Sequence, residues 1–533
     1  MKELSPAAKV VLEKRYLLRD GTGRIVESPE EMFERVAECA SSGDVSLKRE
    51  FFRTMSGLEF LPNSPTLMNA GTPLGQLSAC FVLPVEDSLS SIFETLKETA
   101  LIQQSGGGTG FSFSKLRPRG DTVRSTYGVA SGPISFISIY NAATDVVKQG
   151  GKRRGANMGI LSVDHPDILE FIHAKEKGEA LSNFNISVSA TDAFMEAAKK
   201  GQYYELINPR TEKSAGKLKA SEVFGLIARL AWKTGDPGMI FIDEINRKNA
   251  LPGLGQIEAT NPCGEQPLFP HESCNLGSIN LSLMTGPEGL DWEKMKATVR
   301  LAVEMLDNLI DANRFPVPAI GKMTLKNRKI GLGVMGFAEM LIKLGLRYDS
   351  EEALATAGAV MRFINEEGHK RSAELGEKKG SFPNFKGSVW ERTGQKAMRN
   401  ATVTTIAPTG TISMIADCSS GIEPIFAARA VKKVLGGIKL PLKEIAGEKK
   451  LLVTAHDISP SWHVRMQAAF QEHCDNGVSK TINLPSSASV KDVADAFRLA
   501  YNLKCKGTTA YRDKSKKEQV LYREDSGQEC CTL

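Results

Sequence analysis

The sequence predicts an α/β protein whose strands and helices belong to one body. Short β-rich runs alternate with amphipathic helical segments over 533 residues. No linker rich in Pro, Gly or Ser separates them, which favours continuous packing over separate domains. The composition, 41% hydrophobic and 24% charged, is that of an ordinary globular protein. A chain of this length is expected to form roughly three to four ordinary domains, or one large barrel with extensions.

Charge, apolar runs and cysteine count indicate the kind of ligand, the location and the thiol chemistry to expect. The net charge of +6 is spread along the chain and favours neither anionic small ligands nor nucleic acid. The N-terminus lacks an apolar stretch of signal-peptide length, and no run of about 18 apolar residues occurs, so we expect a cytoplasmic protein without a membrane span. Nine cysteines are too sparse for a disulfide scaffold. A pair that cycles between thiol and disulfide would therefore be catalytic.

Several elements are predicted from local signals. Ser28, Pro29 and Glu31 predict a capped helix start in a helical N-terminal region. Prolines and glycine between 61 and 83 favour short strands and turns. Further helices are expected from Leu89, through Ile137 to Val146, and over Ser221–Trp232 and Glu293–Asp311, with a buried strand at Met239–Ile242.

Two glycine-rich segments invite a nucleotide-binding interpretation. Gly106–Gly110 lacks the Gly-Lys-Ser/Thr ending of a P-loop, so we favour a tight backbone crossing there. Ile330–Gly336 matches the Gly-x-Gly-x-x-Gly dinucleotide pattern, with Asp349 downstream. A helical stretch begins at Ser350, where the dinucleotide fold requires a strand, so we interpret this match as coincidental.

Two other segments suit anions. The β-rich run Ala401–Ala407 leads through Pro408–Ser413 into a helical segment, and such a strand, glycine turn and helix start present free N–H groups and hydroxyls. The loop from 148 to 157 combines glycines with Lys148, Lys152, Arg153 and Arg154. It could contact nucleotides, or it could be a solvated basic turn.

The most distinctive stretch is Asn261-Pro262-Cys263-Gly264-Glu265. It places an amide, a thiol and a carboxylate on alternate residues, so an extended loop would turn all three toward one small substrate. A second thiol, Cys274, follows shortly after.

Three chemistries are compatible with these thiols. A cysteine protease would need a histidine base, and none of the seven histidines stands in a recognisable companion motif. A zinc site would want paired ligands at short spacing, which no cysteine pair provides, so no metal ligands are predicted. Radical chemistry would need one thiol to carry the radical, a carboxylate base and two further thiols as reductants.

The motifs around Cys263 and Cys274, the segment from Asn63 to Cys80 and Pro408–Thr411 resemble the catalytic subunit of ribonucleotide reductases. The closer resemblance is to the adenosylcobalamin-dependent (class II) dimeric type, and it runs from about Arg15 to Tyr511. It implies a ten-stranded α/β barrel of two parallel five-stranded halves, with the radical cysteine on a central finger loop. The division would be a helical region (1–55), the barrel (56–512) and a flexible redox tail (513–533).

The resemblance assigns roles to five residues. Cys263 would form the thiyl radical that takes the ribose 3′ hydrogen, and Glu265 would accept the proton of the 3′ hydroxyl. Asn261 would hold the ribose hydroxyls. Cys80 and Cys274 would reduce the 2′ carbon and become a disulfide.

Further residues match binding segments of that family. Expected substrate contacts are Ser64, Ala79, Gly108, Pro408, Thr409, Gly410, Thr411 and Ile412. Expected contacts of a deoxynucleotide effector at a homodimer interface are Asp87, Ser88, Leu89, Arg117 and Arg124, with Lys148, Gln149 and Arg153 in the loop that relays effector identity. Cys530 and Cys531 would pass electrons from a thioredoxin-like or dithiol reductant.

Three departures from the family limit these assignments. Residues 1–27 leave no room for an ATP-binding cone, so overall control by ATP and dATP is expected to be missing. Cys530 and Cys531 are adjacent, and a disulfide between them would be strained. Ala510 precedes Tyr511 where the oxygen-dependent class has two tyrosines that relay the radical.

The sequence therefore predicts a ribonucleoside-diphosphate reductase that uses adenosylcobalamin. The broken tyrosine pair favours a cofactor that generates the radical in place, and the absence of an Asp-x-His-x-x-Gly motif predicts no histidine replacing the lower base of the cobalamin. One alternative is the same reaction driven by a separate metal-containing subunit. Another is a basic nucleic-acid-binding protein using Lys152, Arg153 and Arg154.

Overall fold

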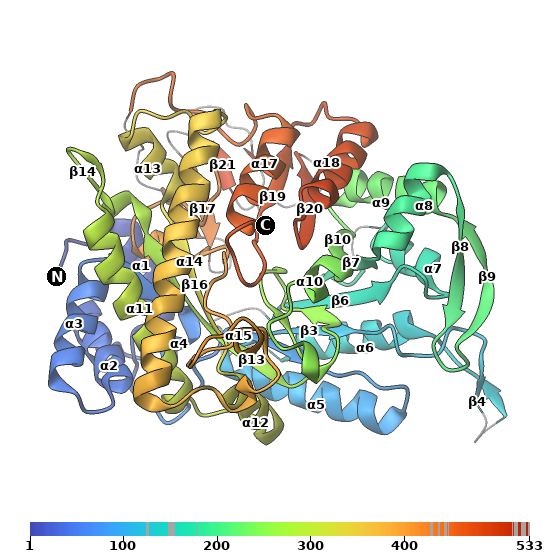
Figure 1. The fold of residues 1–533 in the computed structure, drawn as a ribbon, viewed down its shortest axis with the longest axis horizontal. Helices are drawn as coiled ribbons and strands as arrows, with labels where there is room; N and C mark the ends of the chain where they lie inside the picture. The colour runs from blue at the N-terminus through green and yellow to red at the C-terminus, as the bar shows by residue number, and fades with distance from the viewer. Residues whose placement is uncertain are drawn as a thin grey trace.

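The computed structural model describes residues 1–123, 127–147, 155–177, 180–426, 430–434, 438–441, 445, 447–513, 515, 521–523 and 529–530 (Figure 1). Its centre is a ten-stranded sheet in the order β1-β13-β2-β3-β6-β7-β10-β20-β19, with β16 also paired to β13. Helices pack on one face of the first half of this sheet, whereas its other face packs against segments within 257–276 and 382–407.

The first half of the sheet is parallel. It consists of β2 (Cys80–Leu83), β3 (Gly108–Ser112), β6 (Asn157–Ser162), β7 (Phe184–Ala190) and β10 (Gly238–Phe241). The strands are almost wholly buried, because helices cover one face and segments within 257–276 and 382–407 cover the other. The connections between successive strands carry α5 (Leu89–Ser105), α6 (Pro133–Val146), α7 (Ile168–His173), and α8 (Asp192–Lys200) with α9 (Ala220–Thr234).

The second half is also parallel, but its pairing is less regular. β13 (Glu272–Asn280) pairs with β16 (Ile330–Met335), and β19 (Thr481–Leu484) with β20 (Gly507–Arg512). Isolated parallel bridges at Leu332–Thr404 and Ile406–Val478 connect these pairs. The halves join antiparallel through β2–β13 and β10–β20. The predicted pair of parallel halves is confirmed. The regular ladders alone form an open sheet, and only the isolated bridges through 404–406 link β16 with the segment that leads into β19.

The predicted strand at Ala401–Ala407 is wrong as a regular strand. Asp475 accepts hydrogen bonds at one carboxylate oxygen from the backbone N–H groups of Val403 (2.7 Å) and Thr404 (3.2 Å). A side chain thus takes the place of a neighbouring strand for part of the segment, which leaves only the two bridges. The helix after it, α16 (Ile412–Ile415), is a single turn.

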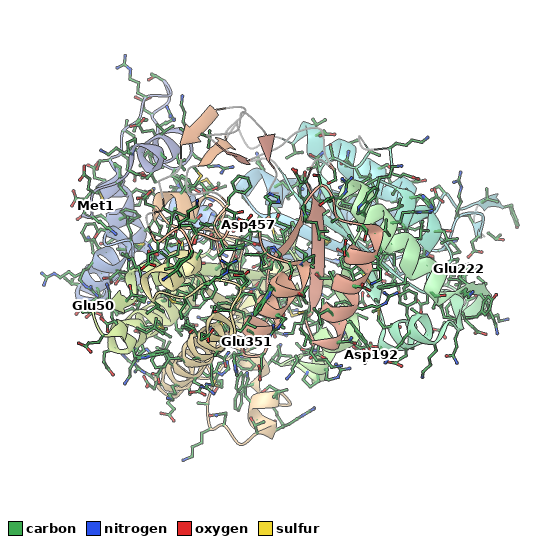
Figure 2. All side chains as sticks on the ribbon, turned by 90° about the horizontal axis from the view of Figure 1, so that it is seen from above. Met1, Glu50, Asp192, Glu222, Glu351 and Asp457 are labelled. Atoms are coloured by element: carbon green, nitrogen blue, oxygen red, sulfur yellow. The ribbon has the colours of Figure 1, made fainter. Side chains whose placement is uncertain are left out.

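Helices form the N-terminal region, as predicted. They are α1 (Pro6–Arg15), α2 (Pro29–Ser41) and α3 (Val45–Ser56), and α2 has the capping box predicted from Ser28 and Glu31. They pack beside α11 (Trp292–Ala312) at the left of Figure 1. Seen from above, Met1 and Glu50 lie at one end of the molecule and Asp192 and Glu222 at the other (Figure 2).

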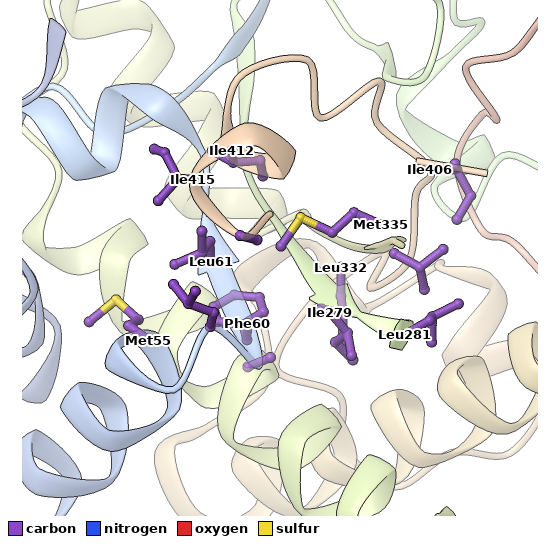
Figure 3. Packing of buried hydrophobic residues seen from close by; sticks show 14 of the residues in the cluster. Met55, Phe60, Leu61, Ile279, Leu281, Leu332, Met335, Ile406, Ile412 and Ile415 are labelled. Carbon is purple, nitrogen blue, oxygen red and sulfur yellow. The ribbon is translucent and has the colours of Figure 1, made fainter. Parts of the chain in front are cut away.

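An apolar cluster joins this region to the sheet. Figure 3 shows Leu61 of β1 (Phe60–Pro62) packed with Ile279 of β13, Leu332 of β16, and Ile412 and Ile415 of α16. All five side chains are buried. Because α16 is only one turn long, this packing fixes the position of the turn before it.

Most other predicted elements are confirmed within about two residues, and β10 ends at Phe241 because Ile242 begins α10 (Ile242–Arg247). The remaining helices are α4 (Ser64–Asn69), α12 (Pro318–Asn327), α13 (Phe337–Lys343), α14 (Glu351–Lys379), α15 (Val389–Arg392), α17 (Pro460–Gln471) and α18 (Val490–Asn502), with 3₁₀ turns at Pro252–Leu254, Leu281–Leu283 and Pro383–Phe385. In the part of the chain described here, no helix is long and apolar enough to cross a bilayer.

Small sheets complete the structure. Two-stranded hairpins are β4 (Thr122–Val123) with β5 (Gly128–Val129), β8 (Tyr203–Asn208) with β9 (Lys213–Lys219), β11 (Ala259–Thr260) with β12 (Pro267–Leu268), and β14 (Thr285–Gly286) with β15 (Gly289–Leu290). A four-stranded sheet contains β17 (Ala430–Val434), β18 (Ile438–Pro441), β21 (Leu521–Arg523) and β22 (Glu529–Cys530). The division at residues 55 and 512 and the flexibility of the tail stay predictions.

Close backbone crossings explain the two glycine-rich motifs. A Cβ added at Gly110 would lie 1.7 Å from the carbonyl oxygen of Thr260, and one at Gly333 would lie 2.2 Å from that of Thr405. Gly110 confirms the predicted backbone crossing. After β16 come α13 and α14, which begins directly after Ser350, so the dinucleotide match was rightly set aside.

Replacing Gly110 with alanine is therefore expected to destabilise the protein by about 3 kcal/mol or more, because backbone must move to admit the methyl group. Gly225→Ala is the matched control: a Cβ there, on the exposed side of α9, would meet nothing within 4 Å. It should be neutral or stabilise by up to about 1 kcal/mol. Urea unfolding of both variants measures the difference, and equal stabilities would contradict the crossing.

Candidate active site

The stretch around Cys263 forms the tip of a hairpin, which we call the finger (259–268). β11 and β12 pair antiparallel, the Asn261 N–H donates to the Gln266 carbonyl (3.1 Å), and the Gln266 N–H donates to Asn261 Oδ1 (3.0 Å). Gly264 has φ +79°, which closes the turn. The predicted extended loop is thus wrong. The turn exposes Cys263 at its tip and buries Asn261 and Glu265.

Both halves of the sheet hold the finger. Asn185 of β7 donates its amide to the Pro262 carbonyl (2.9 Å). The Glu265 carbonyl accepts hydrogen bonds from the Thr405 hydroxyl (2.8 Å) and the Gly477 N–H (2.8 Å). These contacts come from segments far apart in the sequence, so the tip is placed only when both halves are assembled.

Cys80 and Cys274 lie directly opposite each other in the β2–β13 pair. Both are buried thiols and are not joined in a disulfide. Opposed residues of antiparallel strands have Cα atoms about 4.5–5.5 Å apart. In a disulfide, the Cα atoms of the two cysteines are also about 4.4–6.8 Å apart. The two sulfurs are therefore placed to form a disulfide without rearrangement of the strands.

The side chains of the finger meet Cys80. The amide of Asn261 donates to the Cys80 sulfur at 3.0 Å, and the Cys80 thiol donates a longer hydrogen bond to Glu265 Oε1 at 3.8 Å. The fold thus gathers an amide, a carboxylate and a thiol that the sequence places at 261, 265 and 80.

These groups line one cavity of about 490 Å³. Its wall contains Cys80, Asn261, Cys263 and Glu265, while Cys274 lies behind Cys80 in the neighbouring strand. The same wall contains all the predicted substrate contacts, namely Ser64, Ala79, Gly108, Pro408, Thr409, Gly410, Thr411 and Ile412.

One part of the cavity is built for an anion. Thr409 adopts φ +51° and its hydroxyl accepts the Gly421 N–H (2.7 Å), which shapes the turn. The Arg15 guanidinium donates to the Thr411 hydroxyl (2.9 Å), and Ser64 is hydrogen-bonded to the Tyr16 hydroxyl (2.7 Å). Sequence reasoning missed Arg15, because 396 positions separate it from Thr411 and only folding brings them together.

Burial raises the pKa of the Cys274 thiol well above its usual value, and the charge of Glu272 raises it further while that of Lys329 opposes. Lys329 and Glu272 form a fully buried ion pair (2.8 Å), and Asn327 donates to the second carboxylate oxygen (2.6 Å). Cys274 is therefore a protonated thiol at neutral pH, able to donate a proton.

Lys480, a second residue that was not predicted from the sequence, also lines the cavity. Lys480 is buried, with its ammonium 2.5 Å from Glu423 and 3.0 Å from His463 Nδ1. Burial lowers the pKa of Lys480, and it lowers the pKa of His463 well below the usual range. No local pattern in the sequence marks this cluster.

The predicted effector residues that the structure describes, Asp87, Ser88, Leu89 and Arg117, are not part of the cavity lining. The Asp87 carboxylate accepts hydrogen bonds from the Arg117 side chain (2.8 Å) and from the Arg117 backbone N–H (3.1 Å). Ser88 caps the N-terminus of α5. Leu89 is exposed. Arg124, Lys148, Gln149, Arg153 and Cys531 lie outside the described residues. Cys530 lies in β22, with only its backbone described.

Mild oxidation with diamide should link Cys80 to Cys274, because the two thiols face each other across adjacent strands. Mass spectrometry of a non-reduced digest should find this crosslink, and Cys274→Ser should remove it. Cys505, which is buried in a different cluster, should stay reduced. A different partner for Cys274 would contradict the observed register.

Comparison with known proteins places the chain in a family. It matches the profile of the ribonucleotide reductase barrel domain over 78–396, 390–446 and 442–511, and that of the ribonucleotide reductase all-alpha domain over 2–75. It is 51% identical to a vitamin B12-dependent ribonucleoside-diphosphate reductase of Thermoplasma acidophilum, over 97% of this chain and 80% of the relative. For one from Mycobacterium tuberculosis the identity is 47%, over 97% and 81%. A vitamin B12-dependent ribonucleotide reductase of Streptomyces coelicolor is 30% identical, over 96% and 64%. The chain, with two thiols on one cavity and a third paired behind them, belongs to the ribonucleotide reductase large-subunit family.

Proposed function

We propose that this protein reduces ribonucleoside diphosphates to 2′-deoxyribonucleoside diphosphates, with adenosylcobalamin as the radical source. The observation that carries the proposal is the pairing of Cys80 with Cys274 beside Asn261 and Glu265, on a cavity that Cys263 also lines. The names of the relatives at 51% and 47% identity supply the substrate class and the cofactor.

The alternative with a separate metal-containing subunit is not favoured. The most similar relatives given above are named vitamin B12-dependent, and the relative named ribonucleoside-diphosphate reductase subunit alpha, from Chlamydia pneumoniae, is only 28% identical. Ala510 stands in β20 beside the buried Tyr511, so a tyrosine pair is missing there.

The residues at the finger tip fit a bulky cofactor. Cys263 is exposed, and a Cβ added at the adjacent Gly264 would meet no atom within 4 Å. When bound, adenosylcobalamin supplies a radical that can remove the hydrogen atom of a thiol. Cys263 is the only cavity-lining thiol among the described residues that is exposed enough to be approached.

The chain's own residues account for the remaining steps. The Cys263 thiyl removes the 3′ hydrogen atom while Glu265 accepts the proton of the 3′ hydroxyl. The Asn261 amide orients the ribose hydroxyls. The 2′ hydroxyl leaves as water after taking a proton from one thiol of the Cys80–Cys274 pair. The other thiol gives its hydrogen to C2′ as the S–S bond forms, and Glu265 returns its proton to the 3′ oxygen. Cys263 then returns its hydrogen atom to C3′.

The anion end of the cavity suits the diphosphate. The Arg15 guanidinium is a permanent cation with planar donors, and the Ser64 and Thr411 hydroxyls and the backbone of the 408–412 turn add neutral donors. We assign this part of the wall to the substrate phosphates.

We further propose a homodimer through α5 and α6. Their surfaces expose large apolar side chains, which mark interaction sites when they gather. These are Leu89, Phe93, Leu101, Ile139 and Val146. Asp87 and Arg117 lie at the start of α5, where a deoxynucleotide effector would bind at the edge of this surface.

A thioredoxin-like dithiol would reduce the disulfide between Cys80 and Cys274 through Cys530 and Cys531.

Cys263→Ser should abolish deoxynucleotide formation, because an alcohol does not form the required radical under these conditions. The assay is anaerobic, with the purified chain, adenosylcobalamin, a dithiol and each nucleoside diphosphate. Cys418→Ser, which changes a partly buried thiol outside the cavity lining, is the control and should retain turnover. Turnover by Cys263→Ser would refute the mechanism.

Phe93→Glu should convert the dimer to a monomer, because it places a charge in the apolar face of α5. Light scattering coupled to size-exclusion chromatography measures the mass. Leu325→Glu changes a side chain of α12 that is 40% exposed, against 49% for Phe93, and should leave the dimer intact. A wild-type monomer, or a dimer that survives Phe93→Glu, would refute this interface.

A further inference from the structure

Two short segments that do not line the cavity, 403–406 and 475–477, hold the finger from one side. The Thr405 hydroxyl donates to the Glu265 carbonyl (2.8 Å), and the Gly477 N–H donates to the same oxygen (2.8 Å). The Ile406 N–H donates to the Gly477 carbonyl (3.2 Å), so the segments are also bonded to each other. The residue that they hold carries the carboxylate assigned above as the base.

Asp475 joins the two segments where no regular strand ladder does. Its Oδ2 accepts the N–H groups of Val403 (2.7 Å) and Thr404 (3.2 Å). The other edge of the first segment is bonded to β16, because the Leu332 N–H donates to the Val403 carbonyl (2.7 Å) and the Thr405 N–H to the Leu332 carbonyl (3.0 Å). The carboxylate of Asp475 therefore fixes the second edge of this segment, and with it the place of the Thr405 hydroxyl.

Two side chains of α14 hold this carboxylate in turn. His369 Nε2 lies 2.9 Å from Oδ2 and 3.0 Å from Oδ1 of Asp475, and the Asn365 amide donates to Oδ1 (3.1 Å). Burial alone would raise the pKa of Asp475, but His369 and the Val403 N–H lower it below its usual range. The carboxylate is therefore ionised at neutral pH, and its hydrogen bonds are of the stronger, charge-assisted kind.

A neighbouring ion pair shows what a purely structural contact of α14 looks like. Arg371, two residues after His369, bonds to Glu304 of α11 (2.5 Å), and neither side chain lines the cavity. That pair joins one helix to another. The pair of His369 with Asp475 instead leads, through one segment of backbone, to the carbonyl of Glu265.

We propose that Asp475, held by His369, is a positioning residue for the reaction. It places the Thr405 hydroxyl and the Gly477 N–H, which set the position of Glu265. This inference rests on the proposed function, because it presupposes that Glu265 accepts the proton of the 3′ hydroxyl. Since Asp475 does not line the cavity, its loss should lower kcat and leave KM unchanged. A displacement of about 1 Å can lower a rate about a hundredfold.

Kinetics of matched variants test this role, in the anaerobic assay described above. Asp475→Asn keeps the size of the side chain and removes its charge, and should lower kcat at least about tenfold with KM unchanged. Thr405→Val should act in the same way, and Thr405→Ser, which keeps the hydroxyl, should recover most of the rate. Because both residues act through one contact, the double variant should lose less than the product of the two single losses. Glu304→Gln is the control and should keep the wild-type kcat.

Hydrogen exchange followed by mass spectrometry gives a readout that needs no turnover. Asp475→Asn should raise the exchange rate of the finger amides (259–268) about tenfold, because the hairpin opens more often when its attachment is weakened. The amides of α2 should exchange as in the wild type. Glu304→Gln should leave the exchange of the finger unchanged.

Four outcomes would overturn the positioning role. They are a wild-type kcat in Asp475→Asn, an equal loss of kcat in Glu304→Gln, fully multiplicative losses in the double variant, and a rise in exchange at α2 as large as that at the finger. The last would show a general loss of stability. An inactive wild type would overturn the proposed function, and the exchange of the finger would then still decide whether Asp475 places it.

Discussion

The finger is fixed at two backbone carbonyls, and the active-site geometry depends on that attachment. Pro262 is held from the first parallel half by Asn185, and Glu265 is held from the second by Thr405 and Gly477. Because the two halves join antiparallel only at their edges, the finger also connects them through the interior. An error in the assembly of either half would displace the thiol tip from the cavity.

The chemistry depends on keeping polar groups buried but paired. Glu265 and Asn261 lie beside Cys80, and behind them the ion pair of Lys329 with Glu272 is fully enclosed. A buried ion pair is weak evidence for stability, because desolvation offsets much of the attraction. Its position two residues from Cys274 gives it a clearer consequence, since two opposite charges act on a thiol whose pKa burial already raises.

Several features could be predicted from the sequence because they depend on neighbouring residues. The capping box at Ser28 is one, and the motif at 261–265, whose amide, thiol and carboxylate line one cavity, is another. Other expectations failed where distant groups intervene. The extended loop became a tight turn because Asn261 bonds back to Gln266, and the strand at 401–407 was reduced to bridges because Asp475 captures its N–H groups.

The sequence by itself determined the alternation of strands and helices, the glycines needed at backbone crossings and the chemical types of the site residues. Only the tertiary structure decided that Cys80 faces Cys274 and that Arg15 reaches Thr411. Local signals act over a few residues, through hydrogen bonding and side-chain periodicity. Contacts across hundreds of residues depend on strand order and register, which no single segment encodes.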